Sequence, residues 1–410
     1  MTMQQVTDPI ILDSTGHGIV AELGKLVLLK EKELNASVTS ISDWGEVSSM
    51  VEEGAAVDAF PVGTILHTPW TDVRQNVTTE WDFLWRVVHH GTTELRDGET
   101  DNAMYLQSKL CLPFATAYDV REAFYAAGSG GLAAGTYHIN SGAGYQQMAA
   151  NTDYQFTLTQ DLPAGGQLIF KDSTYSVAPT TVQAFASGAA TEANEECTVT
   201  VGSGGTSLGT LAANPTDTVN NIHRHVLGSN RWRDSDVRQW LNSFDASWYS
   251  PMSAFDRVPA LSTYSGFLSG FDPDFAAHVA EVRVDTALPY CDGGTASGTE
   301  CDTTYDKVFL PSAEQLDWAC TWLGVPYGLE GSVWDYWKRV YGATPASMGA
   351  THPEFRLASM GSESTMRDVF ERSASRGYGG SVACCNSSGS LSNTYASTGW
   401  AFCAPACCIV

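Results

Sequence analysis

The last fifty residues of the chain contain few helix-forming residues, and those from Ser373 onwards carry almost no charge. From Ser373 to Val410, Arg376 is the one charged residue, and Ser, Gly, Asn, Ala, Cys and Tyr dominate. A segment of this kind cannot form amphipathic helices, so it predicts short strands joined by long loops. Loops held by a rigid scaffold can change their sequence at little cost in stability.

The sequence before this segment changes its pattern twice. From Pro61, stretches such as TTEWDFLWRVVHHG alternate apolar and polar residues, which is typical of strands. Residues 99–215 begin with a short helical pattern near TAYDVREAFYAAG. Short β-rich runs follow, separated by turn sequences such as LPAGG and GSGG, and they predict a small β-sandwich. Helical spacing then returns at Ile222 and Val226, in DVRQWL with Asp234 or Ser235 as N-cap, and in PSAEQLDWACTWLG.

Residues 1–55 are predicted to form a separate helical attachment segment. The stretch GIVAELGKLVLLKEKELN places apolar residues at helical spacing, at Ile19, Leu23, Leu26, Val27 and Leu34. One short amphipathic helix cannot bury such a stripe alone. It packs against sister copies or a neighbouring structural protein, or alternatively against the domain of its own chain.

Composition and charge exclude several partners. Hydrophobic residues make up 43% of the 410 residues, which is typical of a folded chain long enough for two or three domains. The net charge of −24 argues against nucleic acid and anionic membranes as partners. No apolar run reaches the length that spans a bilayer, so no membrane insertion is expected. The first residues lack a basic n-region and an apolar h-region, which predicts synthesis and folding in a cytoplasm.

The ten cysteines are placed unevenly, with Cys384, Cys385, Cys403, Cys407 and Cys408 in the last 27 residues. Vicinal pairs do not have zinc-ligand spacing, so Cys407 and Cys408 are interpreted as small buried hydrophobic residues. Cys291 and Cys301 bracket the loop CDGGTASGTEC. These two either close a disulfide after a particle leaves the cell or remain thiols.

The stretch RWRDSDVRQWLNS resembles a motif of an uncharacterised domain family common in gut bacteria and their phages, whose members carry a similar WxxSxxRQWLN helix. Further segments look like other marks of that family, in the same order: TTEWDFLWRVVHHG, DKVFLPSAEQL, EFRLASMGS and VACCNSSGSLSNTYASTGWAFCAPACCIV. Two departures occur. Phe355 stands where the family usually has Trp, and Cys403 and Ala404 precede Pro405 where Val-Arg is common.

The resemblance implies a fold similar to C-type-lectin-like domains of the formylglycine-generating-enzyme type. The expected fold class is α+β: a C-type-lectin-like domain with an inserted small β-sandwich and an N-terminal helical attachment segment. The order of the segments implies a discontinuous domain of residues 56–98 and 216–410, with the sandwich of residues 99–215 inserted in it.

Related phage proteins include the variable proteins of diversity-generating retroelements, in which mutagenesis of asparagine codons scatters many residue types over a fixed scaffold. The composition of the C-terminal segment fits that signature, and an ordinary Ser/Gly-rich loop region is the alternative. The candidate variable positions are Ser373, Ser375, Arg376, Tyr378, Ser381, Asn393, Tyr395, Ser397 and Phe402.

In such a surface, aromatic rings give a large contact area for few rotors, and amide and hydroxyl groups give adaptable hydrogen bonds. The expected anchors are Tyr378, Tyr395, Trp400 and Phe402, with Asn386, Asn393 and Ser397 as polar contacts. Each aromatic residue can instead belong to the core, and for Trp400, beside the last strand, the core is the favoured interpretation.

The resemblance suggests two possible activities, calcium-dependent sugar binding and formylglycine generation, and the sequence argues against both. Calcium-dependent lectins use EPN or WND motifs, and neither occurs. Formylglycine-generating relatives need a reactive cysteine pair, and the spacing of Cys403 and Cys408 does not match it. His89, His90, His223 and His225 are interpreted as packing or surface residues, because no nearby ligand set completes a metal site. We therefore predict no enzymatic activity, no cofactor and no metal.

The leading hypothesis is a phage virion protein at a tail tip, fibre or capsid surface that binds a host cell-surface protein or glycan. In that role, residues 1–55 would contact other virion proteins, and the chain would form a homo-oligomer, with a trimer favoured. The alternative is a purely structural virion component, such as a head decoration or collar protein. A bacterial surface or secreted binding protein is a third possibility, disfavoured by the missing signal.

Overall fold

The computed structural model describes residues 38–142, 148–171, 178–211, 227–295, 298–318, 320–326, 328–341 and 355–410, with backbone alone for residues 339–341. Strands predominate over helices, as expected for a β-rich α+β protein. The predicted helix of residues 19–34 and the helical spacing at Ile222 and Val226 lie outside the described residues. Among the described helices, none has both the length and the apolar character needed to cross a bilayer.

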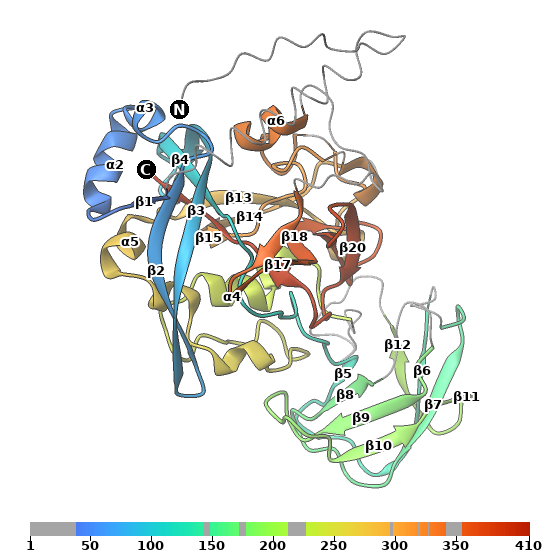
Figure 1. Cartoon of the computed structure of the whole chain (residues 1–410). Coiled ribbons are helices and arrows are strands. Elements are labelled where there is room, and N and C mark those ends of the chain that lie inside the picture. Colours follow the sequence, from blue (N-terminus) through green and yellow to red (C-terminus); the bar gives the residue numbers. More distant parts are fainter. Residues whose placement is uncertain are drawn as a thin grey trace.

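A six-stranded sheet forms the centre of the main domain (Figure 1), in the order β1-β2-β3-β4-β22-β15. Its strands are β1 (Val38–Ser40), β2 (Ile65–Arg74), β3 (Val77–Glu94), β4 (Thr100–Ser108), β15 (Val308–Phe309) and β22 (Ala406–Ile409). β1 pairs with β2 in parallel, and the other neighbours are antiparallel. Gln75 and Asn76 turn the β2–β3 hairpin with positive φ angles of 44° and 68°, as a two-residue type I′ turn requires. In this order, β22, the last strand of the chain, lies between β4 and β15.

Short helices pack around this sheet. They are α2 (Trp44–Glu52), α3 (Ala56–Ala59), α4 (Asp236–Leu241), α5 (Pro273–His278) and α6 (Asp335–Tyr341), with 3-10 turns at Trp232–Asp234, Ala260–Thr263, Phe267–Gly270, Tyr290–Asp292 and Cys320–Leu323. The core between them is aromatic. The rings of Trp70, Phe83, Trp85, Phe271 and Phe275 contact one another at centroid distances of 4.5–6.2 Å.

The expected boundary at residue 55 needs correction. Trp44, Val47 and Val51 of α2 are buried in the main core, and the Trp44 ring lies 4.8 Å from that of Phe275. β1 also pairs with β2. The described part of residues 1–55 therefore belongs to the domain, because its apolar face packs on its own chain.

The C-terminal segment forms the predicted short strands. A four-stranded sheet has the order β20-β19-β18-β21, with β18 (Val369–Ala374), β19 (Ser381–Cys385), β20 (Leu391–Tyr395) and β21 (Phe402–Cys403). Two hairpins accompany it, β13 (Val282–Ala287) with β14 (Cys301–Asp306), and β16 (Leu357–Ser359) with β17 (Ser362–Arg367). The helix predicted in PSAEQLDWACTWLG is wrong. Its described residues form turns and a 3-10 turn, and Asp317 has a φ of 61°, which a right-handed helix cannot contain.

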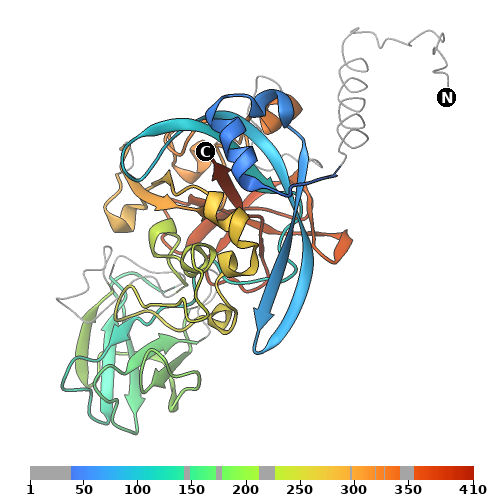
Figure 2. The ribbon, with the colours of Figure 1, turned by 90° about the vertical axis from the view of Figure 1, so that its left-hand side faces the viewer.

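A β-sandwich with its own core extends from the main domain (Figures 1 and 2). One sheet has the order β10-β9-β8-β5 and the other β11-β7-β6-β12. The strands are β5 (Tyr125–Ala126), β6 (Gly135–Asn140), β7 (Asp153–Leu158), β8 (Gln167–Phe170), β9 (Thr181–Phe185), β10 (Glu195–Thr198), β11 (Thr200–Val201) and β12 (Thr206–Thr210). Phe124 and Phe170 stack in its centre with ring centroids 4.1 Å apart.

The predicted start of the sandwich at residue 99 is wrong. β4 pairs with β3 and β22, and Leu112, Phe114 and Tyr118 are buried in the main core. The sandwich core begins at Phe124. Residues 116–124 contain no helix, contrary to the pattern in TAYDVREAFYAAG. This strip runs along the main domain as irregular backbone, fixed where the Asp236 carboxylate accepts from the Val120 amide at 2.9 Å.

Candidate functional site

The structure separates the predicted binding residues into three groups. Tyr378, Asn393 and Trp400 are exposed, whereas Ser381, Asn386, Tyr395 and Ser397 are partly buried. The third group is buried, and for it the prediction needs correction: Ser373, Ser375, Arg376 and Phe402. These four side chains support the loops and do not face solvent.

Ser373 is held inside by a buried carboxylate. Its hydroxyl donates to Glu330 Oε2 and accepts from the Ala313 amide at 2.9 Å. Burial raises the pKa of Glu330, and the neighbouring Arg372 guanidinium opposes that rise. Ser373 therefore joins β18 to the segments around residues 313 and 330, which leaves its hydroxyl no role at the surface.

Arg376 also points inward, although it is the one charged residue of its segment. Its guanidinium donates to three carbonyl oxygens, those of Leu288 at 2.9 Å, Gly298 at 2.9 Å and Gly324 at 3.3 Å. It also donates to the Glu300 carboxylate at 3.0 Å. Backbone amide hydrogen bonds lower the pKa of Glu300 to about 2, and the bond from Arg376 adds to this. Arg376 thus holds three loops together.

Phe402 belongs to β21 and is covered by a cation. Its backbone pairs with Val369, and the Arg367 guanidinium lies 4.8 Å from its ring centroid. Ser375 is buried after the other end of β18, where its amide donates to the Ser381 carbonyl at 3.0 Å. Both residues pack within the domain.

The loop between β18 and β19 presents Tyr378. The side-chain amide nitrogen of Asn230 lies within hydrogen-bond distance of the carbonyl oxygens of Ser375 (3.0 Å), Tyr378 (3.0 Å) and Ser381 (2.6 Å). Asn230 is fully buried, so this anchor is shielded from water. The Tyr378 side chain is 55% exposed on the loop that Asn230 holds.

The loop between β20 and β21 presents Trp400. Its start is fixed where the Ala396 amide donates to Gly380 at 2.9 Å and the Ser397 amide donates to Leu227 at 2.9 Å. Its end is fixed where the Thr116 amide donates to Ala401 at 2.9 Å. Trp400 is 56% exposed, so the interpretation of this residue as core is wrong.

Asn386 and Asn393 have different roles in the β19–β20 hairpin. The Asn386 side-chain oxygen Oδ1 accepts from the amides of Ser388 at 3.1 Å and Ser390 at 3.0 Å, so Asn386 shapes the turn. Asn393 is exposed on β20, the outer strand of its sheet. We define the C-terminal face as Tyr378, Asn393, Tyr395, Ser397 and Trp400.

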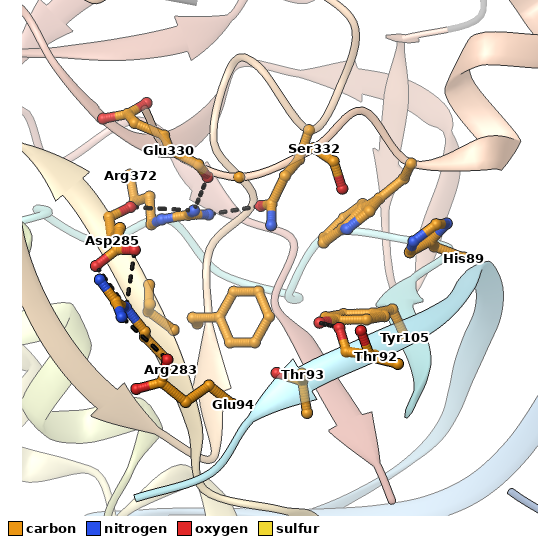
Figure 3. A pocket seen from close by; sticks show the side chains of 15 residues that line it. His89, Thr92, Thr93, Glu94, Tyr105, Arg283, Asp285, Glu330, Ser332 and Arg372 are labelled. Carbon is orange, nitrogen blue, oxygen red and sulfur yellow. Dashed lines mark hydrogen bonds and ion pairs between the residues drawn. The ribbon is translucent and has the colours of Figure 1, made fainter. Parts of the chain in front are cut away.

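A polar pocket of about 220 Å³ lies outside the predicted residues (Figure 3). Tyr105, Phe309 and Trp334 give it aromatic walls, and Tyr105 and Trp334 have ring centroids 6.0 Å apart. Burial raises the pKa of Tyr105, so its phenol remains protonated. The sequence does not reveal this pocket, because its walls come from β3, β4, β13, β15, β18 and the loop before α6.

Ion pairs surround the polar pocket. Arg283 contacts Glu94 and Asp285, each at 3.0 Å, and His89 Nδ1 lies 2.9 Å from Asp335. In Figure 3, Arg283, Asp285 and Glu94 lie on one side of the cavity and His89 on the other. The basic and acidic groups therefore compensate one another around the rim.

Arg372 lies on a third side of this pocket and is fully buried. Its terminal nitrogens donate to Leu310 O at 2.9 Å, to Gln315 Oε1 at 2.6 Å and to Glu330 O at 2.7 Å. Its Nε has no hydrogen-bond partner among the described residues. Burial lowers the pKa of Arg372, and Glu330 opposes that shift.

The cysteines are thiols in the structure. Cys403, Cys407 and Cys408 are fully buried, as predicted for Cys407 and Cys408, and burial raises the pKa of each. Cys291 and Cys301 do not form a disulfide: the first thiol contacts the Asp292 carboxylate and the second the Leu329 carbonyl.

The histidines of the described residues are held by single partners. His90 Nε2 lies 2.8 Å from the Phe60 carbonyl oxygen, and His89 contacts Asp335. His223 and His225 lie outside the described residues. Within the described part of the chain, no three His, Cys, Asp or Glu side chains form a group that could hold a metal ion.

Comparison with known proteins gives one match. Residues 209–410, just under half of the chain, match the family described as Domain of unknown function (DUF6273). No curated protein and no solved structure matches the chain. The matched residues contain α4 and the C-terminal face. Strands β2, β3 and β4 lie outside them, although β4 pairs with β22 in the same sheet.

Proposed function

We propose that the chain is a bacteriophage virion protein that binds the surface of a host cell through the C-terminal face. The observation that carries this proposal is the exposure of Tyr378 and Trp400 on loops that buried groups hold in place. Large aromatic side chains on rigid loops give much contact area for little loss of conformational entropy.

The proposal includes a C-type-lectin-like fold for the main domain. Support comes from the position of β22, which joins the C-terminus to β4 and β15 of the central sheet, while the loop-rich sheet of β18–β21 lies beside it. The motif resemblance to a phage-associated family supports the virion assignment. Proposed partners are a host protein or glycan at the C-terminal face.

Charge supports a contact of this type. The C-terminal face contains no ionised side chain, although the chain carries a net charge of −24. A face of aromatic, amide and hydroxyl groups binds by packing and neutral hydrogen bonds, so its affinity depends little on salt.

Binding of the fluorescently labelled chain to a panel of gut bacterial strains, measured by flow cytometry, tests the proposal. The double variant Tyr378→Ser/Trp400→Ser should bind at least about tenfold more weakly than the unmodified chain, because two anchors are lost. Phe244→Ser is the matched control, since Phe244 is 50% exposed but lies outside the C-terminal face. Equal binding by the double variant and the unmodified chain would show that the face is not the attachment surface. A purely structural virion component would bind none of the strains.

A further inference from the structure

The polar pocket described above has the size and lining of a site for one small ring-shaped ligand. We propose that it binds a single neutral sugar ring of a carbohydrate. The proposal does not depend on the C-terminal face, since that face and the pocket have no residue in common.

The size of the cavity limits the ligand. At about 220 Å³ it is smaller than the pockets of roughly 300–1,000 Å³ that take drug-sized ligands. One monosaccharide ring is a ligand of this smaller class. A longer chain of sugars would extend past Ser332, which is exposed at the edge of the pocket.

The aromatic walls suit the apolar face of a sugar ring. Phe309 and Trp334 are almost wholly buried and back the pocket wall, and the partly buried Tyr105 ring, which projects from the central strand β4, offers the aromatic surface that a ligand can cover. C–H groups of a pyranose pack against such ring faces and remove apolar surface from water. A fixed wall of this kind binds without a loss of side-chain entropy.

The charges favour a neutral ligand over an ionic one. Arg283 is paired with Glu94 and Asp285, and His89 is paired with Asp335. An anion or a cation would have to compete with these pairs. A sugar hydroxyl both donates and accepts, so it can contact the carboxylates and the guanidinium without separating them.

The rim groups remain accessible for such contacts. The side chains of Arg283 and Glu94 are 41% and 36% exposed. The Arg372 Nε has no partner among the described residues, but it is buried, so Arg283 and Glu94 supply the accessible contacts. In Figure 3, the side chains of Arg283, Ser332 and His89 lie on different sides of the cavity, so they can contact different hydroxyls of one pyranose ring.

An array of immobilised glycans tests the assignment. It carries neutral hexoses, deoxyhexoses and N-acetylhexosamines, singly and as oligosaccharides, beside hexuronic and sialic acids. The full chain should bind one or more of the neutral glycans, and the matching free monosaccharide should compete. Binding to the acidic glycans alone, or to no glycan, would overturn the proposal.

Two variants connect that binding to the pocket. Ser332→Trp places a bulky side chain at the exposed edge and should weaken glycan binding by at least about tenfold. Arg283→Met removes donors without adding bulk and should weaken it as well. Ser247→Trp is the matched control, an exposed serine that does not line the pocket, and should bind like the unmodified chain. All three should keep the same thermal unfolding midpoint.

Undiminished binding by a folded Ser332→Trp variant would contradict the assignment. Glycan binding that Ser332→Trp loses and Tyr378→Ser/Trp400→Ser keeps belongs to the pocket, and binding with the opposite pattern belongs to the C-terminal face. The proposals for the pocket and for the C-terminal face are therefore tested separately.

Discussion

At Arg376, a charged side chain in an otherwise uncharged segment lies inside the protein and not at its surface. From the sequence alone, a lone charged side chain is expected in solvent, because an unpaired buried charge costs much free energy. Here the cost is offset by three carbonyl oxygens and a carboxylate around the guanidinium. Such a set of acceptors is assembled by loops distant in sequence, so the residue type alone could not reveal it.

Removal of this guanidinium should destabilise the fold. Arg376→Ala leaves three carbonyl groups without their donor, and we expect the free energy of unfolding to fall by about 3 kcal/mol or more. Urea unfolding followed by circular dichroism measures the change. Tyr378→Ala, two residues along the chain but exposed, should stay within about 0.5 kcal/mol of the unmodified chain. Similar effects for the two variants would contradict the supporting role of Arg376.

The buried carboxyl group of Glu371 gives a second prediction, on the pH dependence of stability. It is fully buried, and its carboxylate oxygens have no hydrogen-bond partner among the described residues. Burial raises its pKa from 4.5 to about 8, and the nearby Glu330 adds to this. The folded state therefore keeps a proton that the unfolded chain loses between these pH values. Its contribution to stability is complete at low pH and is lost as the pH rises towards 8.

Urea unfolding between pH 5 and pH 8 tests this. The free energy of unfolding should fall with pH, by up to about 1.4 kcal/mol per pH unit from Glu371. Glu371→Gln mimics the protonated form, so its pH dependence should be shallower by that amount. The same pH dependence in both proteins would show that Glu371 does not hold a proton in the folded state.

For helices and strands, features that depend on neighbouring residues, such as caps and turns, can be predicted from the sequence. Pairings between strands far apart in the chain cannot. Ser235, one of the two predicted candidates, caps α4, since a cap depends on residues three apart. The turn sequences between residues 125 and 211 likewise separate the strands of the sandwich. In contrast, β4 follows a composition change and was assigned to the sandwich, because nothing local in the sequence shows that it pairs with β3 and β22. The polar pocket was missed for the same reason.

The cap of α4 can be measured directly. Ser235 Oγ accepts from the Arg238 amide at 3.2 Å and donates to the Trp232 carbonyl at 3.0 Å. Ser235→Ala should lower the free energy of unfolding by about 1 kcal/mol. Ser247→Ala, at an exposed serine outside the helices, should have no measurable effect. A neutral result at Ser235 would mean that tertiary packing alone fixes the start of the helix.

At the scale of the molecule, the sandwich has the features of an insertion into a domain that is complete without it. Its core cluster is separate from that of the main domain. The two ends of the insertion meet where the Ser229 amide donates to the Asp119 carboxylate at 2.6 Å. The contacts between the parts are both apolar and polar: Phe255 packs against Ile169 and Phe185 of the sandwich, and Gln167 Nε2 donates to the Ala254 carbonyl at 2.7 Å.

Replacement of residues 123–211 by a short Gly/Ser linker should therefore leave the main domain folded. We expect a single cooperative thermal transition, because the aromatic core and the six-stranded sheet are retained. Differential scanning calorimetry measures it. Loss of a cooperative transition would show that the sandwich is part of the folding unit.

The orientation of the C-terminal face in an assembled particle tests the central claim most directly. Our proposal is a virion role, and an electron cryomicroscopy map of an assembled particle that contains this chain would show where Tyr378 and Trp400 lie. Our account predicts that both project from the particle surface into solvent, on each copy of the chain. Both side chains packed against neighbouring subunits would contradict it and would assign the chain to the structural components of the particle.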